Sequence, residues 1–214
     1  MIKLYRFDYS PYARKVQKVL DLLQLPYQVI DVPYGDRNEL ATLTGGYIQV
    51  PVLVTDKGKV VVDSRAICEE LLQGAHAEKL TPSPWQGPIW AYTDWCDNLL
   101  EDVLFRIASP MIRHRFSSPS DQGFYVFIKE RKFGKGCVED WAKNRATLIK
   151  KAQEMLTPSF KTLRQRPFLF GDAPTLADAA LYGEYVMLKT ADAELCNEIS
   201  PDFEKWAVRL ETKG

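Results

Sequence analysis

The sequence contains few residues of the kinds that build metal sites or disulfide frameworks. Its 214 residues include two histidines and four cysteines, and these cysteines share no short spacing: Cys68, Cys96, Cys137 and Cys196. Zinc sites usually draw on closely spaced Cys or His pairs. We therefore expect no metal site, and we expect the cysteines to be reduced thiols of a cytoplasmic protein.

Net charge and long apolar runs are also lacking. The 28 basic and 28 acidic residues cancel, so no overall basic field attracts nucleic acid or an anionic membrane. No apolar run approaches the roughly 20 residues that cross a bilayer. The segment from Met1 to Arg6 does not resemble a signal peptide. We expect neither a nucleic-acid nor a membrane partner.

Strand and helix patterns alternate in residues 1–74. Apolar periodicity predicts strands at 2–9, 27–32, 50–53 and 60–62, and helices at 11–25, 37–43 and 64–72. The first helix should connect two parallel strands, whereas the tight turn at 56–58 makes the last two antiparallel. The prediction is a βαβαββα order with a mixed four-strand sheet.

The rest of the chain reads as helical. Prolines and glycines mark 75–88 as a linker, so we predict an α/β domain at 1–74 and an all-α domain at 89–214. Long helices are predicted at 89–107, kinked or ended by Pro110, and at 138–163. Residues 117–123 read as a polar loop and 124–130 as a weak helix. Two further helices should begin at Thr175, in a capping box with Asp178, and at Ser200.

Three short stretches in the first domain could form a binding site. Ser10 precedes a proline at a helix start. Val50–Pro51 enters a strand, and its peptide bond is a candidate for the cis form, which would turn the Val50 backbone toward a ligand. Asp63 and Ser64 stand at another helix start, which Ser64 can cap, where a carboxylate, a hydroxyl and free N–H groups converge. Such a site could hold both ends of an amino-acid-like group.

Four motifs, in this order and at these separations, resemble the cytosolic glutathione transferases over nearly the whole chain. They are Ser10-Pro11-Tyr12-Ala13-Arg14-Lys15-Val16, Val50-Pro51-Val52-Leu53, Asp63-Ser64-Arg65-Ala66-Ile67 and Thr175-Leu176-Ala177-Asp178. The serine before proline is similar to the tau-like enzymes, whereas cysteine there would resemble the omega class. The resemblance implies a thioredoxin-like domain, a helical-bundle domain and a homodimer formed by the third-helix region.

The resemblance also implies roles for the site residues, with glutathione as co-substrate. The Val50 backbone, beside Pro51, would pair with the cysteinyl part, and Asp63 and Ser64 would hold the γ-glutamyl end. Gln49 stands where the family often has lysine. Arg37 is the nearest cation for the glycyl carboxylate.

Ser10 is then the candidate catalytic residue. Its hydroxyl would donate to the glutathione sulfur, stabilising the thiolate that attacks an apolar electrophile, as in detoxification. The competing interpretation is a plain N-cap, because a hydroxyl that points at a ligand cannot also cap fully. Tyr9 and Tyr12 are alternates, although Tyr12 fits the apolar face of its helix. The electrophile should lie between the domains, near helices that carry Trp90, Tyr92, Trp95, Arg106, Met111 and His114.

Other functions stay open at this point. A related glutathione-dependent isomerase, lyase, dehalogenase or peroxidase would need the same motifs. A non-catalytic binding or interaction module is favoured by Gln49 and by the unusual Gly45-Gly46 loop. A glutaredoxin-like reductase is disfavoured, because no cysteine stands at the first helix start.

Overall fold

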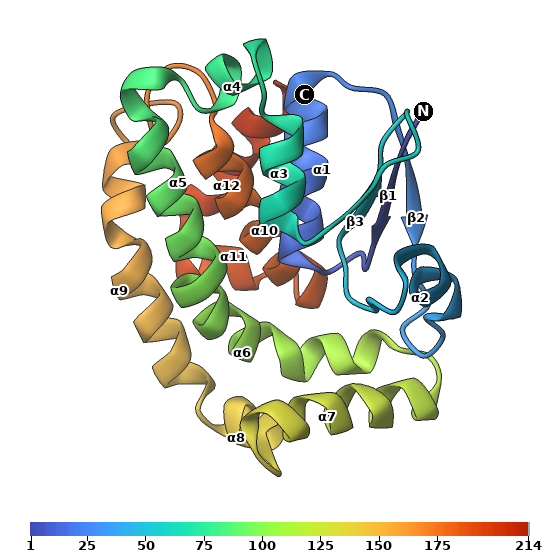
Figure 1. Ribbon diagram of the computed structural model, residues 1–214. Coiled ribbons are helices and arrows are strands. Elements are labelled where there is room, and N and C mark those ends of the chain that lie inside the picture. Colours follow the sequence, from blue (N-terminus) through green and yellow to red (C-terminus); the bar gives the residue numbers. More distant parts are fainter. Residues whose placement is uncertain (214) are drawn as a thin grey trace.

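The predicted βαβαββα order is present in the computed structural model, which describes residues 1–213 (Figure 1). Its elements are β1 Ile2–Arg6, α1 Pro11–Leu23, β2 Tyr27–Asp31, α2 Asn38–Thr44, β3 Val52–Val54, β4 Val60–Val62 and α3 Ser64–Leu71. The strands form one mixed sheet in the order β2-β1-β3-β4. The β1–β2 pair is parallel, and the β1–β3 and β3–β4 pairs are antiparallel, as expected.

Alternating side chains on β1 divide the core of this domain into two layers. Leu4 belongs to the large core that also holds residues of α1 and α3, such as Val16 and Ile67. The next residue, Tyr5, points to the other face of the sheet and packs with Leu40 of α2. The sheet is therefore covered on both faces, and only the α1–α3 face meets the second half of the chain.

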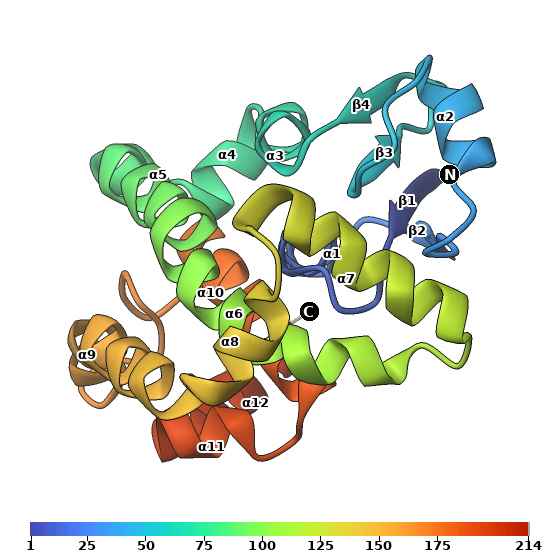
Figure 2. The ribbon, with the colours of Figure 1, turned by 90° about the horizontal axis from the view of Figure 1, so that it is seen from below.

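The second half is helical, as predicted. Its helices are α4 Ala75–Leu80, α5 Gln86–Trp95, α6 Glu101–Ile112, α7 Pro119–Phe133, α8 Cys137–Lys143, α9 Arg145–Leu163, α10 Leu176–Ala191, α11 Leu195–Ile199 and α12 Pro201–Glu211. The buried helix α10 packs directly on α1. Figures 1 and 2 show α6 and α7 below the end of α1 at which that helix begins.

The predicted capping box at the start of α10 is confirmed. The Asp178 carboxylate accepts hydrogen bonds from the backbone N–H and the hydroxyl of Thr175, each at 3.0 Å. The same buried carboxylate also accepts from Leu169 N at 3.0 Å and from Trp206 Nε1 at 3.2 Å. It therefore ties the connector before α10 and helix α12 to one helix terminus.

Two loop-like segments turn out to contain helices. The polar loop expected at 117–123 is wrong, because α7 begins there at Pro119, with the Ser118 hydroxyl accepting from Asp121 N at 3.4 Å. This is the same Ser-Pro helix start that marks Ser10. The expected linker at 75–88 contains α4 and a single helical turn at Ser83–Trp85.

The long helices also differ in their breaks. Pro110 does not end the first one: a π-helical turn at Cys96–Leu100 joins α5 to α6, which continues to Ile112. The single helix predicted at 138–163 is wrong, because it breaks at Asn144 between α8 and α9. There the Asn144 side chain donates to Asp140 O at 2.9 Å, a local bond that competes with the helical pattern.

Within residues 1–213, no helix combines the length and the apolar character that a bilayer crossing requires.

Candidate functional site

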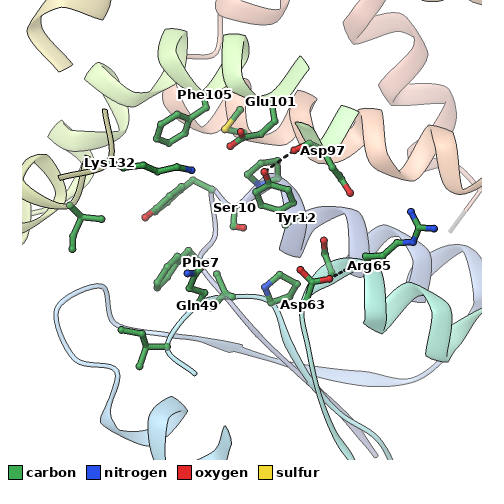
Figure 3. A pocket seen from close by; sticks show the side chains of 18 of the residues that line it. Phe7, Ser10, Tyr12, Gln49, Asp63, Arg65, Asp97, Glu101, Phe105 and Lys132 are labelled. Carbon is green, nitrogen blue, oxygen red and sulfur yellow. Dashed lines mark hydrogen bonds between the residues drawn. The ribbon is translucent and has the colours of Figure 1, made fainter. Parts of the chain in front are cut away.

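One cavity, with a volume of about 770 Å³, brings together the residues singled out from the sequence. It lies between the start of α1, the approach to β3, the start of α3 and the helices α5 to α7 (Figure 3). All nine candidates line it: Tyr9, Ser10, Tyr12, Arg37, Gln49, Val50, Pro51, Asp63 and Ser64. The Val50–Pro51 peptide bond is cis, as expected. A cavity of this size accommodates a small-molecule ligand.

Ser10 is buried in the cavity wall, with 6% of its surface exposed. It is the N-cap of α1, and its Oγ accepts a hydrogen bond of 3.4 Å from Ala13 N. A hydroxyl carries one donor and two acceptor positions, so accepting this bond leaves its O–H free to donate. Ser10 is thus an N-cap, as one of the two competing interpretations has it, and its O–H is not used by this cap.

The two tyrosine alternates form walls of the cavity. The Tyr12 hydroxyl already donates to Asp97 O at 2.9 Å. Tyr9 stacks on Phe7, with the ring centroids 5.7 Å apart, and meets Tyr125 edge-on at 6.4 Å. Burial raises the pKa values of the Tyr9 and Tyr12 phenols far above the ordinary value of tyrosine, so both phenols are protonated at neutral pH.

Asp63 caps α3 where the sequence suggested Ser64. Its Oδ1 accepts from Arg65 N at 2.8 Å and from Ala66 N at 3.3 Å, while its carbonyl accepts from Ile67 N at 3.0 Å. The Asp63 backbone has φ 73° and ψ 135°, a conformation that non-glycine residues rarely adopt and that clusters at functional sites. Because both side-chain bonds use Oδ1, Oδ2 is left for a ligand. Ser64, which is the first residue of α3, is buried and also lines the cavity.

Arg65 connects this corner of the cavity to α5. Its guanidinium pairs with Glu69 at 2.8 Å and with Asp94, and it lies 4.0 Å from the centroid of the Trp90 ring. Because Trp90 and Asp94 belong to α5, the Arg65 guanidinium links α3 to the helical half at this corner.

Arg37 is held over the cavity by the loop that carries Gln49. Its Nε donates to Tyr34 O at 3.1 Å and its Nη1 to Ile48 O at 3.0 Å. The guanidinium lies 4.9 Å from the centroid of the Phe7 ring. A guanidinium has five N–H donors, so these contacts leave donors for a carboxylate.

A second wall of the cavity was missed at the sequence level. It comes from α6 and α7 and contains Glu101, Phe105, Lys129, Lys132 and Phe133. Burial raises the pKa of Glu101 to about 7 and lowers the pKa of Lys129 to about 8. The signal was available, because Lys129 and Lys132 are three residues apart and share a helix face. The helices α5 and α6, which the sequence analysis placed near the electrophile, do contribute to the lining, through Asp94, Glu101 and Phe105. The six side chains used there to mark this region do not line the cavity: Trp90, Tyr92, Trp95, Arg106, Met111 and His114.

Thiols and metal ligands do not gather here. All four cysteines are buried outside the cavity lining, and burial raises the pKa of Cys68 to about 12. No cluster of three or more His, Cys, Asp or Glu side chains suited to a metal ion occurs in the part of the chain that the structure describes.

Comparison with known proteins gives the same family for both halves. The glutathione S-transferase N-terminal domain matches residues 4–79, and the glutathione S-transferase C-terminal domain matches residues 89–207. Glutathione S-transferase omega-1 of Sus scrofa is 19% identical over 210 residues, which cover 98% of this chain and 76% of that protein.

Solved structures share the fold over the whole length. A glutathione S-transferase of Ceriporiopsis subvermispora in complex with glutathione has a TM-score of 0.80 at 22% identity, covering 99% of this chain and 96% of that one. A glutathione transferase of Phanerochaete chrysosporium has a TM-score of 0.76 at 17% identity, covering 100% and 97%. With both domain matches in register along the chain, this protein belongs to the cytosolic glutathione S-transferase superfamily.

Proposed function

We propose that this protein is a glutathione transferase that binds glutathione in the cavity with the sulfur at Ser10. The observation that carries the proposal is the position of the Ser10 hydroxyl, which lies at the N-terminus of α1 in a cavity shared with Val50 and Asp63. The solved relative from Ceriporiopsis subvermispora binds glutathione on the same fold, which supports this choice of ligand.

The γ-glutamyl end of glutathione carries an ammonium and a carboxylate, and the start of α3 offers a partner for each. Asp63 Oδ2 is the acceptor for the ammonium, because Oδ1 is occupied by the cap. The hydroxyl and N–H of Ser64 donate to the carboxylate, which the positive end of the helix also attracts. The Val50 backbone pairs with the cysteinyl part, and the glycyl carboxylate lies toward Gln49 and Arg37.

The chemistry requires a thiolate. A free cysteine thiol has a pKa of about 8.5, and lowering it by about two units needs roughly 2.7 kcal/mol of preference for the anion. A hydrogen bond to a charged acceptor contributes about 1.5–3 kcal/mol. The N-terminus of α1 adds roughly 0.3–2 kcal/mol. Ser10 supplies the donor at this terminus, and the two effects together amount to about 1.8–5 kcal/mol, a range that includes the required value.

The reaction then proceeds in two steps. The thiol proton leaves to solvent, and the thiolate, held by Ser10 Oγ–H, attacks the electrophilic carbon of the second substrate. A carbon–sulfur bond forms, and the leaving group departs with its bonding electron pair. Ser10 accepts no covalent bond at any stage.

Calorimetric titration with glutathione and steady-state turnover test this proposal in three variants. Ser10→Ala removes both the donor and the cap, whereas Ser10→Gly removes the donor but keeps much of the capping preference. Ser200→Ala is the matched control, because Ser200 caps α12 before a proline, accepts from Asp202 N at 3.2 Å and is not part of the cavity lining. We expect turnover to fall by about tenfold to a hundredfold in both Ser10 variants and to stay unchanged in Ser200→Ala.

Other outcomes would point to other functions. Equal turnover in Ser10→Gly and wild type would contradict the thiolate role and leave Ser10 as an N-cap. Glutathione binding without turnover, and without a lowered thiol pKa, would favour a non-catalytic binding module. A glutathione-dependent isomerase, lyase, dehalogenase or peroxidase would retain the Ser10 dependence but select a different second substrate.

We further propose that the protein is a homodimer in the cytoplasm, with the α3 region against the helical half of a partner. Sedimentation of the pure protein at micromolar concentration tests this proposal, and a monomer mass would contradict it.

A further inference from the structure

The cavity wall contributed by α7 carries two ammonium groups. Lys129 and Lys132 stand three residues apart on this helix, and both line the cavity. Figure 3 shows Lys132 and Glu101 pointing into the same space, across Ser10 from Asp63. These lysines thus lie on the side of the sulfur position that the proposed glutathione contacts leave open.

Neither lysine forms a salt bridge: within residues 1–213, no carboxylate lies within 4.0 Å of the ammonium group of Lys129 or Lys132. Three carboxylates of the cavity are engaged elsewhere: Asp94 pairs with Arg65, Asp97 pairs with Lys15, and Asp63 caps α3. The remaining acidic residue of this cavity is Glu101, whose charge interacts with both lysines without a salt bridge.

Glu101 of α6 is the acidic residue whose negative charge offsets the charge of the lysines, and only a fraction of it is ionised at neutral pH. Burial raises its pKa to about 7, so it is about half protonated at neutral pH. The pKa of Lys129 is lowered to about 8, mainly by burial, and the charge of Arg37 lowers it further. Two lysines against part of one carboxylate leave a net positive wall near pH 7. Lys132 is exposed, whereas Lys129 is half-buried with only the partial charge of Glu101 opposite it, which is costly, and a bound anion would offset that cost.

Aromatic rings lie beside both ammonium groups. Lys129 Nζ lies 5.0 Å from the centroid of the Phe105 ring and 4.4 Å from that of Tyr125. Lys132 Nζ lies 4.9 Å from the centroid of the Phe133 ring, and the Phe105 and Phe133 rings are 6.1 Å apart. Such a surface favours a flat apolar body with a negatively charged end.

We propose that the second substrate is an aromatic or otherwise apolar electrophile with an anionic group of the carboxylate class, which Lys129 and Lys132 bind. This inference rests on the proposed function, because it takes the sulfur of glutathione to lie at Ser10. The lysines select the electrophile and leave the binding of glutathione itself to the other wall.

Two thioether conjugates of glutathione test this proposal without turnover. S-(para-carboxybenzyl)glutathione places a carboxylate in the second half of the cavity, and S-(para-carbamoylbenzyl)glutathione places an uncharged group of the same shape there. Calorimetry should show the carboxylate conjugate binding roughly tenfold more tightly to the wild type at neutral pH. The preference should decrease as the pH rises through about 8, because Lys129 loses its proton while Glu101 becomes fully ionised.

Variants of α7 test whether its two lysines cause the preference for the carboxylate conjugate. In the double variant Lys129→Gln and Lys132→Gln, the preference for the carboxylate conjugate should disappear, while the affinity for unsubstituted glutathione stays within about twofold of the wild type. Arg131→Gln is the control on the same helix: Arg131 is exposed and does not line the cavity, and its substitution removes one positive charge, half of the change in the double variant. It should keep the preference.

The outcomes separate this inference from the function on which it rests. Equal affinity of the wild type for both conjugates would overturn the inference and leave the proposed function intact. Loss of affinity for unsubstituted glutathione in the double variant would overturn it as well, because the lysines would then bind glutathione itself. Failure of all three ligands to bind the wild type would overturn both proposals.

Discussion

At the scale of single residues, Ser10 and Asp63 each use one polar atom or lone pair to cap a helix and leave another polar group unused. Ser10 accepts a hydrogen bond from Ala13 N and retains its O–H, and Asp63 caps α3 through Oδ1 and retains Oδ2. The free atom in each case is the one that the proposed glutathione contacts require. A substitution that keeps the cap and removes the free atom should therefore lower glutathione affinity and leave the free energy of unfolding nearly unchanged.

Asp63→Asn makes this separation. Asparagine is as good an N-cap as aspartate, so we expect the free energy of unfolding to change by less than about 0.5 kcal/mol. The ammonium of glutathione loses its charged acceptor, and glutathione affinity should fall about tenfold or more. Thermal unfolding and calorimetric titration measure the two effects. Asp63→Ala, which loses both functions, is the comparison, and unchanged affinity in Asp63→Asn would contradict the assignment.

Glu101 should make the stability of the folded protein depend on pH. Burial raises its pKa from 4.5 to about 7 in the folded state, so the folded protein binds more protons than the unfolded chain between these values. Its contribution to stability is thus present at low pH and is lost as the pH rises toward 7. Glu101→Gln, which mimics the protonated form, should match the wild type near pH 4.5 and exceed its free energy of unfolding by up to about 3 kcal/mol at pH 8.

Glu204 provides a control of opposite sign. Hydrogen bonds from Lys189 and Tyr185 lower its pKa, so the wild type should lose stability relative to Glu204→Gln as the pH falls. Denaturant unfolding between about pH 3 and pH 8 measures both differences: that of Glu101 lies between 4.5 and about 7, and that of Glu204 lies below 4.5. A pH-independent gap for Glu101→Gln would contradict the raised pKa.

At the scale of helices, α10 holds the start of α1 in place. Gly183 of α10 lies so close to α1 that a Cβ there would be 2.2 Å from the carbonyl oxygen of Pro11. Backbone cannot move aside as a flexible side chain can, so any larger residue at 183 pushes the two helices apart. Because Pro11 follows Ser10 directly, this contact positions the proposed catalytic hydroxyl.

We expect Gly183→Ala to lower the free energy of unfolding by about 1–3 kcal/mol, through overpacking, and to weaken glutathione binding. Gly123→Ala in α7 is the matched control, because a Cβ there meets nothing within 4 Å. It should be neutral or stabilise by up to about 1 kcal/mol, since alanine is the better helix former. Equal stabilities of the two variants would contradict the positioning role of Gly183.

The elements differ in how far the sequence predicts them. The strands follow from short apolar segments bounded by turn signals, and α1 follows from its single apolar face and from its Ser-Pro start. Helix α7 was taken for a loop at its beginning, since its polar first turn concealed the same Ser-Pro signal at Ser118. Its faces are also mixed: Phe127 is exposed while Lys129 is largely covered by the cavity wall. Helix prediction relies on apolar residues recurring on the buried face. A lysine on the covered face and a phenylalanine on the exposed face weaken that pattern.

One wall of the candidate site could be predicted from the sequence and the other could not. The wall built by the first domain could be predicted, because its residues stand at strand and helix ends with distinct signals. The α6–α7 wall depends on how the two halves pack, and local sequence does not encode that. The cap on α3 was misplaced by one residue, since the left-handed φ of Asp63 is unusual for aspartate.

At the scale of the whole molecule, the cavity is a product of the two halves. The thioredoxin-like half contributes the helix starts and the Val50–Pro51 turn, and the helical half contributes Glu101, Phe105 and the lysines of α7. Aromatic contacts across the boundary, such as Tyr34 with Phe116 at 4.8 Å, hold the halves together near the cavity. In this account the first half binds and activates glutathione, and the second half selects the electrophile.

The most direct test of the central claim is the pKa of the glutathione thiol in the complex. Ultraviolet difference absorbance of the thiolate, recorded against pH, measures it for the wild type and for Ser10→Gly. The account predicts a pKa about two units below the free value of about 8.5 in the wild type, and a return of one unit or more toward it in Ser10→Gly. An unshifted pKa in the wild type, or the same lowered pKa in both proteins, would contradict it.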